Sequence, residues 1–380
     1  MINSFWKVIS ITAFAALVIF GCKKSASTSS TNTDTNKTVP PTYNLRHPGI
    51  FNSQADLDFI KSTVNAGGSH PLVAGYQILA NDGRGSLSFT PTPFAIVDGV
   101  PSGSSPSEDA YRDDAHAAYI HTIKWVVTGN PAYKDKAIQI YNAWSYTFTG
   151  LVVYSNNQQT LESSWALPIW IAGAEIIRFY NNGAAGWSAD DVGQFLSFVD
   201  KQYHTVLGPS ASAPNWHISQ ALSIMATGVF FDSVAIYNTG YTRMQNQIDE
   251  ISANGDVPEL TRDFEHSQYC LIGMAQGAEI AHQQGDDGLW TRTNGTSSPR
   301  LLLCSESYVK CLMGTGTPNY QSSSGSQRHS APYEIILTRY SDLGMAAPQT
   351  RTYVLTQNRP ENCSQNHFVG WLSATHANVQ

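Results

Sequence analysis

Apolar side chains recur with α-helical spacing in segment after segment of this chain, and strand-like alternation is scarce before the C-terminus. In residues 132–148, Ala137, Ile140 and Trp144 would share one helical face. Breaks such as Gly129-Asn130-Pro131 separate these segments at intervals of about 25 residues. The pattern predicts helices at 109–128, 132–148, 161–180, 215–231, 241–251, 262–284 and 301–312, and one that starts at 188. Long helices joined by short turns predict an all-α body of antiparallel hairpins.

The N-terminus has the features of a sorting signal and is excluded from the fold. Lys7 precedes an apolar run of 12 residues, 9–20, which is too short for a membrane span of about 20 residues but suits a signal peptide. Gly21-Cys22 at its end resembles a bacterial lipoprotein signal, with cleavage before Cys22 and a lipid on its sulfur. Residues 22–42 are rich in Ser, Thr, Asn and Lys and are expected to be a disordered tether.

The remaining residues, 43–380, have a globular composition without a second linker, so we expect one folded domain. Charged residues are 13% of the chain and the formal net charge is −7, which argues against a nucleic-acid partner. Two long loops rich in Gly, Ser and Pro, 81–107 and 314–326, are expected to cover or line a cleft.

Cysteine and metal patterns add little. The four cysteines after Cys22 could pair in three ways, but Cys304 and Cys311 on one helix would be about 10 Å apart, too far for a direct disulfide. The sequence contains no C-x-x-C, H-E-x-x-H or EF-hand motif, so no metal site is predicted.

The strongest functional signal is residues 262–269, Arg-Asp-Phe-Glu-His-Ser-Gln-Tyr. In a helix, Arg262, His266 and Tyr269 would lie at i, i+4 and i+7 and project from one face. A guanidinium can hold a carboxylate, while an imidazole and a phenol can move protons beside it. The alternative is an ordinary solvated polar face.

A second candidate group is Asn215-Trp216-His217, which precedes a predicted helix. As structural residues, Asn215 would be the helix N-cap and Trp216 a core anchor. His217 would then lie in the first turn, where the helix dipole disfavours the imidazolium ion. A neutral imidazole can donate to a substrate group or take a proton from it.

Two further pairs of residues lie near predicted helix starts. Glu162 is explained by the helix dipole and Trp165 by the core, although an aromatic side chain at a cleft can also stack on sugar rings. Tyr111 and Arg112 belong to a charged cluster that is either a set of salt bridges or a substrate clamp.

Several short motifs, taken in order, resemble the alginate-lyase superfamily of polysaccharide lyases over nearly all of the chain after residue 43. The resemblance implies an incomplete (α/α) toroid, and a reaction that requires no metal or organic cofactor. The motifs are Asp114-Ala115-His116-Ala117-Ala118-Tyr119, Thr128-Gly129-Asn130-Pro131-Ala132-Tyr133, Asn142-Ala143-Trp144, Asn215-Trp216-His217, residues 262–269, Ala278-Glu279-Ile280-Ala281, Gln284-Gly285-Asp286-Asp287, Tyr333-Glu334, Thr338-Arg339-Tyr340 and Arg359-Pro360-Glu361.

The resemblance also implies a site. In the family, an Asn/His pair on one helix and an Arg plus a Tyr on another surround the uronate next to the scissile bond. The matching residues here are Asn215 with His217, and Arg262 with Tyr269. Two departures stand out. Trp216 separates Asn215 from His217, so Asn215 could be only a cap. The Arg-to-Tyr spacing varies in the family, so His266 or Gln268 could take the role of Tyr269.

The implied reaction is β-elimination on a 4-linked polyuronate, alginate or a glucuronan, giving an unsaturated uronate end. The C5 proton of a uronate is too weakly acidic for a side-chain base unless the carboxylate is neutralised. Arg262, with His217 and Asn215, would stabilise the enolate charge. Tyr269, its pKa lowered by nearby cations, would remove the proton or protonate the leaving O4. His266 would orient Tyr269 or serve as the base.

We therefore expect an exported monomeric lyase, lipid-anchored to the outer membrane in the periplasm or at the cell surface. Asn215, Trp216, Gln268, Glu162, Trp165, Tyr111 and Arg112 are its expected substrate-binding residues. One alternative is a lipid-anchored glycan-binding protein without chemistry. Another is a glycoside hydrolase, which would need two carboxylic acids across the cleft, for which Glu162 and Asp114 are candidates.

Overall fold

The computed structural model describes residues 43–315, 331–363 and 366–380. The expected signal peptide, Cys22, the tether and most of the predicted loop at 314–326 lie outside the described residues. Residues Tyr43–Gln380 form one compact unit. Among the described residues, no helix combines the length and apolar character needed to cross a membrane.

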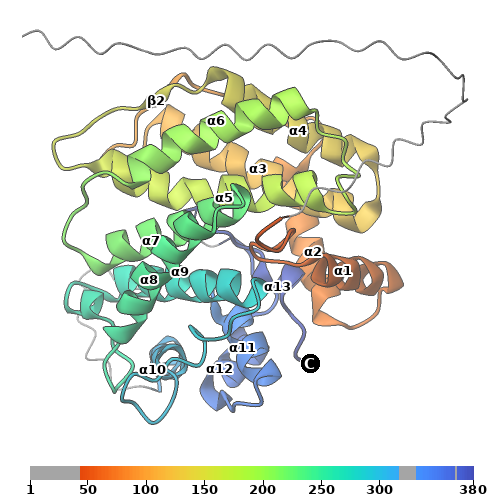
Figure 1. Ribbon diagram of the computed structural model, residues 1–380. Coiled ribbons are helices and arrows are strands. Elements are labelled where there is room, and N and C mark those ends of the chain that lie inside the picture. The colour runs from red at the N-terminus through yellow and green to blue at the C-terminus, as the bar shows by residue number, and fades with distance from the viewer. Residues whose placement is uncertain (1–42, 316–330, 364–365) are drawn as a thin grey trace, which may run out of the picture. The chain divides into compact units, whose positions relative to one another are not determined.

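The prediction of an all-α body is confirmed (Figure 1). The one sheet among the described residues is a short parallel pair, β1 (Ile96–Val97) with β2 (Gly150–Leu151). Two early helices, α1 and α2, were not in the predicted series. The α-helices are α1 (Gln54–Ala66), α2 (Pro71–Ala80), α3 (Pro106–Thr128), α4 (Pro131–Thr147), α5 (Gln158–Phe179), α6 (Ala189–Val206), α7 (Pro214–Phe230), α8 (Val234–Asp249), α9 (Phe264–Gln283), α10 (Arg300–Leu312), α11 (Tyr333–Asp342), α12 (Pro348–Tyr353) and α13 (Leu372–Thr375).

The hairpin of α3 and α4 shows how the sequence sets the turns. Gly129 ends α3 in the left-handed conformation, with φ 67°, which glycine adopts without a Cβ clash. Asn130 then caps α4 by accepting a hydrogen bond from the backbone N–H of Ala132, and Pro131 occupies the first helical position. Three adjacent residues therefore stop one helix and start the next.

Helices that are buried on nearly all sides alternate along the chain with helices that bury one face. Helices α5, α7 and α9 have buried residues along almost their whole length and lie side by side in Figure 1. Helix α6, in contrast, buries one stripe that includes Phe195, Phe198 and Val206. This alternation places inner helices behind outer ones, as a toroid requires.

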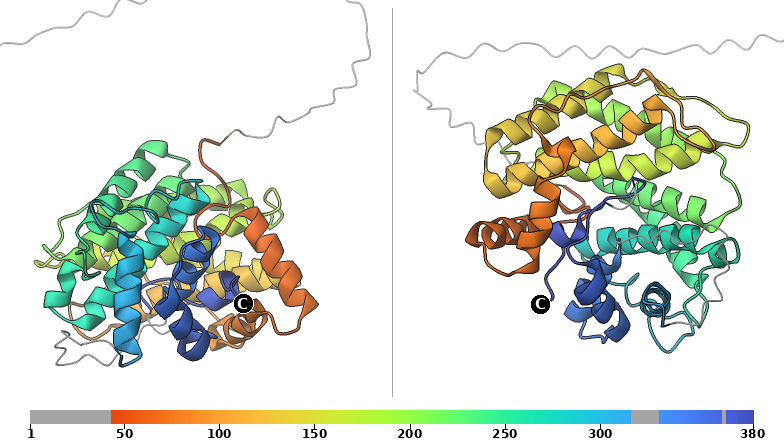
Figure 2. Two further views of the ribbon diagram at one scale, coloured as in Figure 1. Left: turned by 90° about the horizontal axis from the view of Figure 1, so that it is seen from below. Right: turned by 180° about the vertical axis from the view of Figure 1, so that it is seen from behind.

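The two ends of the folded unit meet, as Figure 2 shows for the blue C-terminal helices and the red-orange N-terminal ones. A Cβ on Gly75 of α2 would lie 2.3 Å from the backbone carbonyl of Ser373 in α13, so only glycine permits this contact. This contact fixes the C-terminal segment against α2. The same segment places His367 and Phe368 against Tyr269 near the start of α9.

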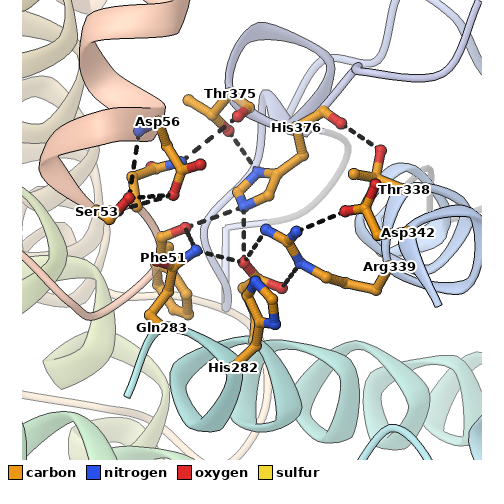
Figure 3. A network of polar contacts seen from close by, with 12 residues as sticks. Phe51, Ser53, Asp56, His282, Gln283, Thr338, Arg339, Asp342, Thr375 and His376 are labelled. Atoms are coloured by element: carbon orange, nitrogen blue, oxygen red, sulfur yellow. Dashed lines mark hydrogen bonds and ion pairs between the residues drawn. The ribbon is translucent and has the colours of Figure 1, made fainter. Parts of the chain in front are cut away.

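A buried polar network ties both ends of the unit to α9 and α11 (Figure 3). Glu279 on α9 accepts two hydrogen bonds of 2.7 Å from Arg339 on α11 and one of 2.8 Å from Gln283. His376 lies 3.7 Å from the Glu279 carboxylate, and its Nε2 donates to the Phe51 carbonyl at 3.1 Å. The network satisfies a fully buried carboxylate and joins four segments of the chain.

Candidate active site

The start of α9 differs from the prediction in one important respect. Asp263 is the N-cap, and its side chain accepts a hydrogen bond of 2.7 Å from the backbone N–H of His266. The helix therefore begins at Phe264, and Arg262 lies before it, at the end of a 3₁₀ turn, Pro258–Thr261. The expectation that Arg262, His266 and Tyr269 share one helical stripe is wrong, because the helix starts after its N-cap Asp263 and Arg262 lies outside it.

Arg262 is nevertheless available at the surface of the site. Its side chain is 52% exposed, and its ion pairs with Glu259 and Asp263 both have a long N···O distance of 3.4 Å. The His266 ring contacts the same Asp263 carboxylate through Nδ1, at 2.8 and 2.9 Å. Burial would raise the pKa of Asp263, but the bonds from His266 and the charge of Arg262 lower it overall.

Tyr269 is nearly buried, with 7% of its surface exposed, and its hydroxyl donates to Oε1 of Glu265 at 3.0 Å. Burial and the Glu265 carboxylate raise the pKa of Tyr269 well above its usual value, although the Arg112 guanidinium opposes this effect. The sequence-based expectation that nearby cations lower this pKa is therefore wrong. Burial, followed by the negative charge of Glu265, decides the direction of the shift.

An imidazole that the sequence analysis missed lies against Tyr269. The ring of His367, from the C-terminal segment, has its centroid 5.3 Å from that of Tyr269 and 4.1 Å from that of Trp165. Its Nε2 is 3.3 Å from Nη1 of Arg112. Because a guanidinium can only donate, Nε2 of His367 accepts this bond and carries no proton. His367 was missed because its segment has no helical periodicity.

Arg112 is held between two carboxylates on neighbouring helices. It donates from Nε to Glu162 at 2.7 Å and pairs with Glu108 at 2.5 Å, and its guanidinium lies over the Trp165 ring. Burial, followed by the charge of Glu162, raises the pKa of Glu108 to about 7. Glu162 is fully buried, so the expectation that it binds substrate is wrong, and it instead holds Arg112 in place.

Two other predicted substrate-binding residues are structural. Tyr111 has no exposed surface and donates its hydroxyl to Gln202, so its expected role as a substrate clamp is wrong. Gln268 is 1% exposed, and its amide lies 3.4 Å from the Phe264 carbonyl one turn earlier. Trp165 and Trp216 are each 8% exposed. Both predicted tryptophans are therefore mostly part of the core.

The first turn of α7 is arranged differently from the prediction. Ala213 is the N-cap and Pro214 the first helical residue, so Asn215 is not the cap. The Glu259 carboxylate instead accepts from the Asn215 backbone N–H at 3.1 Å and provides negative charge at this helix end. The Asn215 side-chain oxygen is buried and has no hydrogen-bond partner within the described structure.

His217 lines a hollow of about 370 Å³ between the start of α7 and helix α8. Arg243 and Asn246 of α8, Gln220 of α7 and Ser210 of the preceding loop line the same space. Tyr269, in contrast, has ring contacts with His266, His367 and Phe368. The structure thus brings Tyr269 together with Arg112, Trp165 and His266, whereas the His217 ring lines the polar hollow at the start of α7.

The chain matches the family model described as alginate lyase over residues 97–301. No curated protein sequence matches it. Alginate lyase A1-III from Sphingomonas species A1 is similar in structure, with TM-score 0.64 and 15% identity over 86% of this chain and 97% of that one.

Two more solved structures share the architecture. A tyrosine-to-phenylalanine variant of A1-III, complexed with a tetrasaccharide, has TM-score 0.63 and 15% identity over 86% of this chain and 96% of that one. An alginate lyase from Bacteroides ovatus has TM-score 0.60 and 14% identity over 84% and 98%. The likeness confirms the predicted (α/α) toroid.

Proposed function

Because the chain belongs to the alginate lyase family of polysaccharide lyases, we propose that it cleaves a 4-linked polyuronate, alginate or a glucuronan, by β-elimination. The observation that carries the proposal is a chain of contacts at the start of α9 that links an exposed guanidinium to a phenol. Arg262 pairs with Asp263, Asp263 binds His266, and the His266 ring contacts the ring of Tyr269. The tetrasaccharide complexes of A1-III variants support an oligosaccharide as the kind of ligand.

Arg262 is the residue best placed to neutralise the uronate carboxylate. Its present partners, Glu259 and Asp263, are 3.4 Å away, and half of its side chain is in water. Exchange of one carboxylate for another at such a site costs little desolvation. Once the substrate carboxylate is paired, negative charge that develops on the enolate is stabilised in the transition state.

Tyr269 then supplies the proton transfer at C5 and O4. A tyrosine oxygen can take a proton from carbon as its own phenolic proton leaves, and it can donate a proton to a leaving oxygen on the same side of the sugar. His266 lies beside the ring, with centroids 5.6 Å apart, but Asp263 holds its Nδ1, so we assign it to orienting the site. No step of this reaction requires a metal ion.

A glycoside hydrolase is less compatible with the site. The two carboxylates considered for it, Glu162 and Asp114, are 0% and 2% exposed. Glu162 is bound by Arg112, and Asp114 accepts hydrogen bonds from Trp144 at 2.6 Å and from the Thr92 backbone at 2.7 Å. Acids that must reach a glycosidic oxygen or a water cannot be enclosed in this way.

We also propose that the mature protein begins at a lipid-modified Cys22 and acts as a monomer on the periplasmic side of the outer membrane, or at the cell surface. The supporting observation is the sequence alone, a short apolar run that ends in Gly21-Cys22. Replacement of Cys22 by Ser should move the protein from the membrane fraction to the soluble fraction. Retention in the membrane fraction would contradict the lipid anchor.

The function is tested by incubating the purified protein separately with polymannuronate, polyguluronate, glucuronan and hyaluronan. We expect ultraviolet absorbance to rise on one of the first three, because elimination conjugates the new C4=C5 double bond with the carboxylate. New reducing ends without this absorbance would indicate a hydrolase. Binding without either signal would indicate a glycan-binding protein.

A further inference from the structure

The hydroxyl of Tyr269 is already committed to a carboxylate on its own helix. Glu265 and Tyr269 are four residues apart on α9, so their side chains meet on one face, with Oη 3.0 Å from Oε1. Glu265 is half-buried and Tyr269 nearly buried. Resting on the elimination proposed above, we propose that Glu265 accepts the phenolic proton of Tyr269 while Tyr269 removes the C5 proton.

A free phenolate is a poor candidate for the base in this environment. Burial and the Glu265 carboxylate both raise the pKa of Tyr269, and Asp263 adds to the effect. Arg112 opposes it, but Glu108 and Glu162 already share its charge. Tyr269 therefore enters the reaction as a phenol, and it can accept a proton only if its own proton leaves.

Glu265 gives that proton a destination. As the C5–H bond breaks, its proton goes to Oη of Tyr269 and the phenolic proton passes to the Glu265 carboxylate. The electron pair left on C5 then forms the C4=C5 double bond while the C4–O4 bond breaks. Tyr269 donates its proton to O4 and recovers one from Glu265. The net change moves one proton from C5 to O4, and both side chains return to their starting forms.

The groups around the pair suit a carboxylate that is charged at the start of each turnover. Glu265 lies in the first turn of α9, where the helix dipole stabilises negative charge. The titratable and charged side chains that the described structure places against the pair are Arg112 of α3, His367 of the C-terminal segment, and Asp263 and His266 at the start of α9. Of these groups, Arg112 can balance the negative charge of the pair, whereas Asp263 adds to it.

We call the transfer of the phenolic proton from Tyr269 to Glu265 the relay. The replacement Glu265→Gln distinguishes the relay from a base that is a free phenolate, because the two mechanisms predict opposite changes in kcat. The amide oxygen still accepts the Tyr269 hydrogen bond but cannot take its proton. The relay predicts that kcat falls about 10²–10⁴-fold with little change in KM. A free phenolate predicts an unchanged or higher kcat, because the charge that opposes phenol ionisation has been removed.

The pH profile gives a second readout that a structural role would not produce. In the wild type, kcat should fall at acid pH, because a carboxylic acid at position 265 could not accept the phenolic proton. In Glu265→Gln this acid limb should disappear, and the residual activity should rise with pH as Tyr269 ionises. Persistence of the wild-type acid limb in the variant would overturn the proposal.

Two controls complete the experiment. Glu250→Gln makes the same chemical change at an exposed glutamate that ends α8, and it should leave kcat unchanged. The double variant Glu265→Gln, Tyr269→Phe should be no slower than Tyr269→Phe alone, because the two residues act as one unit. A further multiplicative loss would overturn the relay. An inactive wild type would instead refute the proposed function, while an active wild type with an equally active Glu265→Gln would refute only the relay.

Discussion

Replacing Tyr269 by Phe removes one hydroxyl from the centre of the site and leaves its packing unchanged. The ring keeps its contacts with His266, His367 and Phe368. The lost hydrogen bond reaches Glu265, which is half-buried and can bind water instead, so the unfolding free energy should fall by only about 0.5–1.5 kcal/mol. Loss of proton transfer should reduce kcat by at least about 10²–10⁴-fold, or roughly 3–5 kcal/mol of barrier.

The assay is the rate of unsaturated-uronate formation, measured beside urea unfolding of the same preparation. Tyr146→Phe is the matched control, because Tyr146 also donates to a carboxylate, Asp191 at 2.9 Å, but is 60% exposed and lies on the outer helix α4. It should keep wild-type turnover. Wild-type-like activity in Tyr269→Phe would refute the role of the phenol, and a loss of more than about 3 kcal/mol of stability would show that the hydroxyl holds the fold.

Three further predictions follow from the same contacts. Arg262→Ala should raise KM and lower kcat together in steady-state kinetics, because the guanidinium meets the carboxylate in ground and transition states; unchanged binding of uronate oligomers would place Arg262 elsewhere. His217→Gln should lower kcat by about 10²-fold, as the role expected of His217 from the sequence requires, whereas retained turnover would show that the ring only lines the hollow beside α8. Glu279→Gln should cost about 3–5 kcal/mol in urea unfolding, because Arg339 would lose its buried charged partner and keep only the exposed carboxylate of Asp342; a loss under about 1 kcal/mol would contradict this.

The pH dependence of stability has a definite sign at Glu279. Burial raises its pKa, but the charge of Arg339 and its hydrogen bonds outweigh burial and lower the pKa below the value in the unfolded chain. A carboxyl with a lowered folded-state pKa stabilises the protein above its unfolded value, roughly pH 4.3, and this contribution is lost as the pH falls further. Urea unfolding of the wild type should therefore weaken below about pH 4.3, and Glu279→Gln should lack that part of the decline.

Much of the fold could be predicted because its signals are local. The break at Gly129-Asn130-Pro131 ends one helix and starts another by backbone conformation alone, and the one-sided stripe of α6 shows its buried face. The toroid was predicted from the family resemblance, which rests on the order of the short motifs. Helices α1 and α2 were not predicted. The contact of α2 with the C-terminal helix α13 is between residues far apart in the sequence, and local periodicity does not reveal such contacts.

The site was predicted less completely, because it depends on competition between neighbouring groups. Asp263 caps α9, so the helix starts after Arg262 and not at it. At α7, the carboxylate of Glu259 from another segment accepts from the backbone N–H of Asn215, which was expected to be the cap itself. His367 reaches Tyr269 from about a hundred residues further along the chain. Glu265 was the one missed residue with a readable signal, since its i, i+4 spacing to Tyr269 is visible in the sequence.

The two arginines of the site differ in what they can offer a substrate. Arg112 is 5% exposed and already shared by Glu108 and Glu162, so a third carboxylate would find little uncompensated charge there. Arg262 is half-exposed, and its partners at 3.4 Å can be exchanged. An uncharged polysaccharide would leave Arg262 paired as it is, with no neutralised carboxylate beside C5. Preference for polyuronates should therefore depend on Arg262, which can exchange its present partners for a substrate carboxylate. Arg112 instead has a structural role, since it binds His367, whose ring packs against Tyr269.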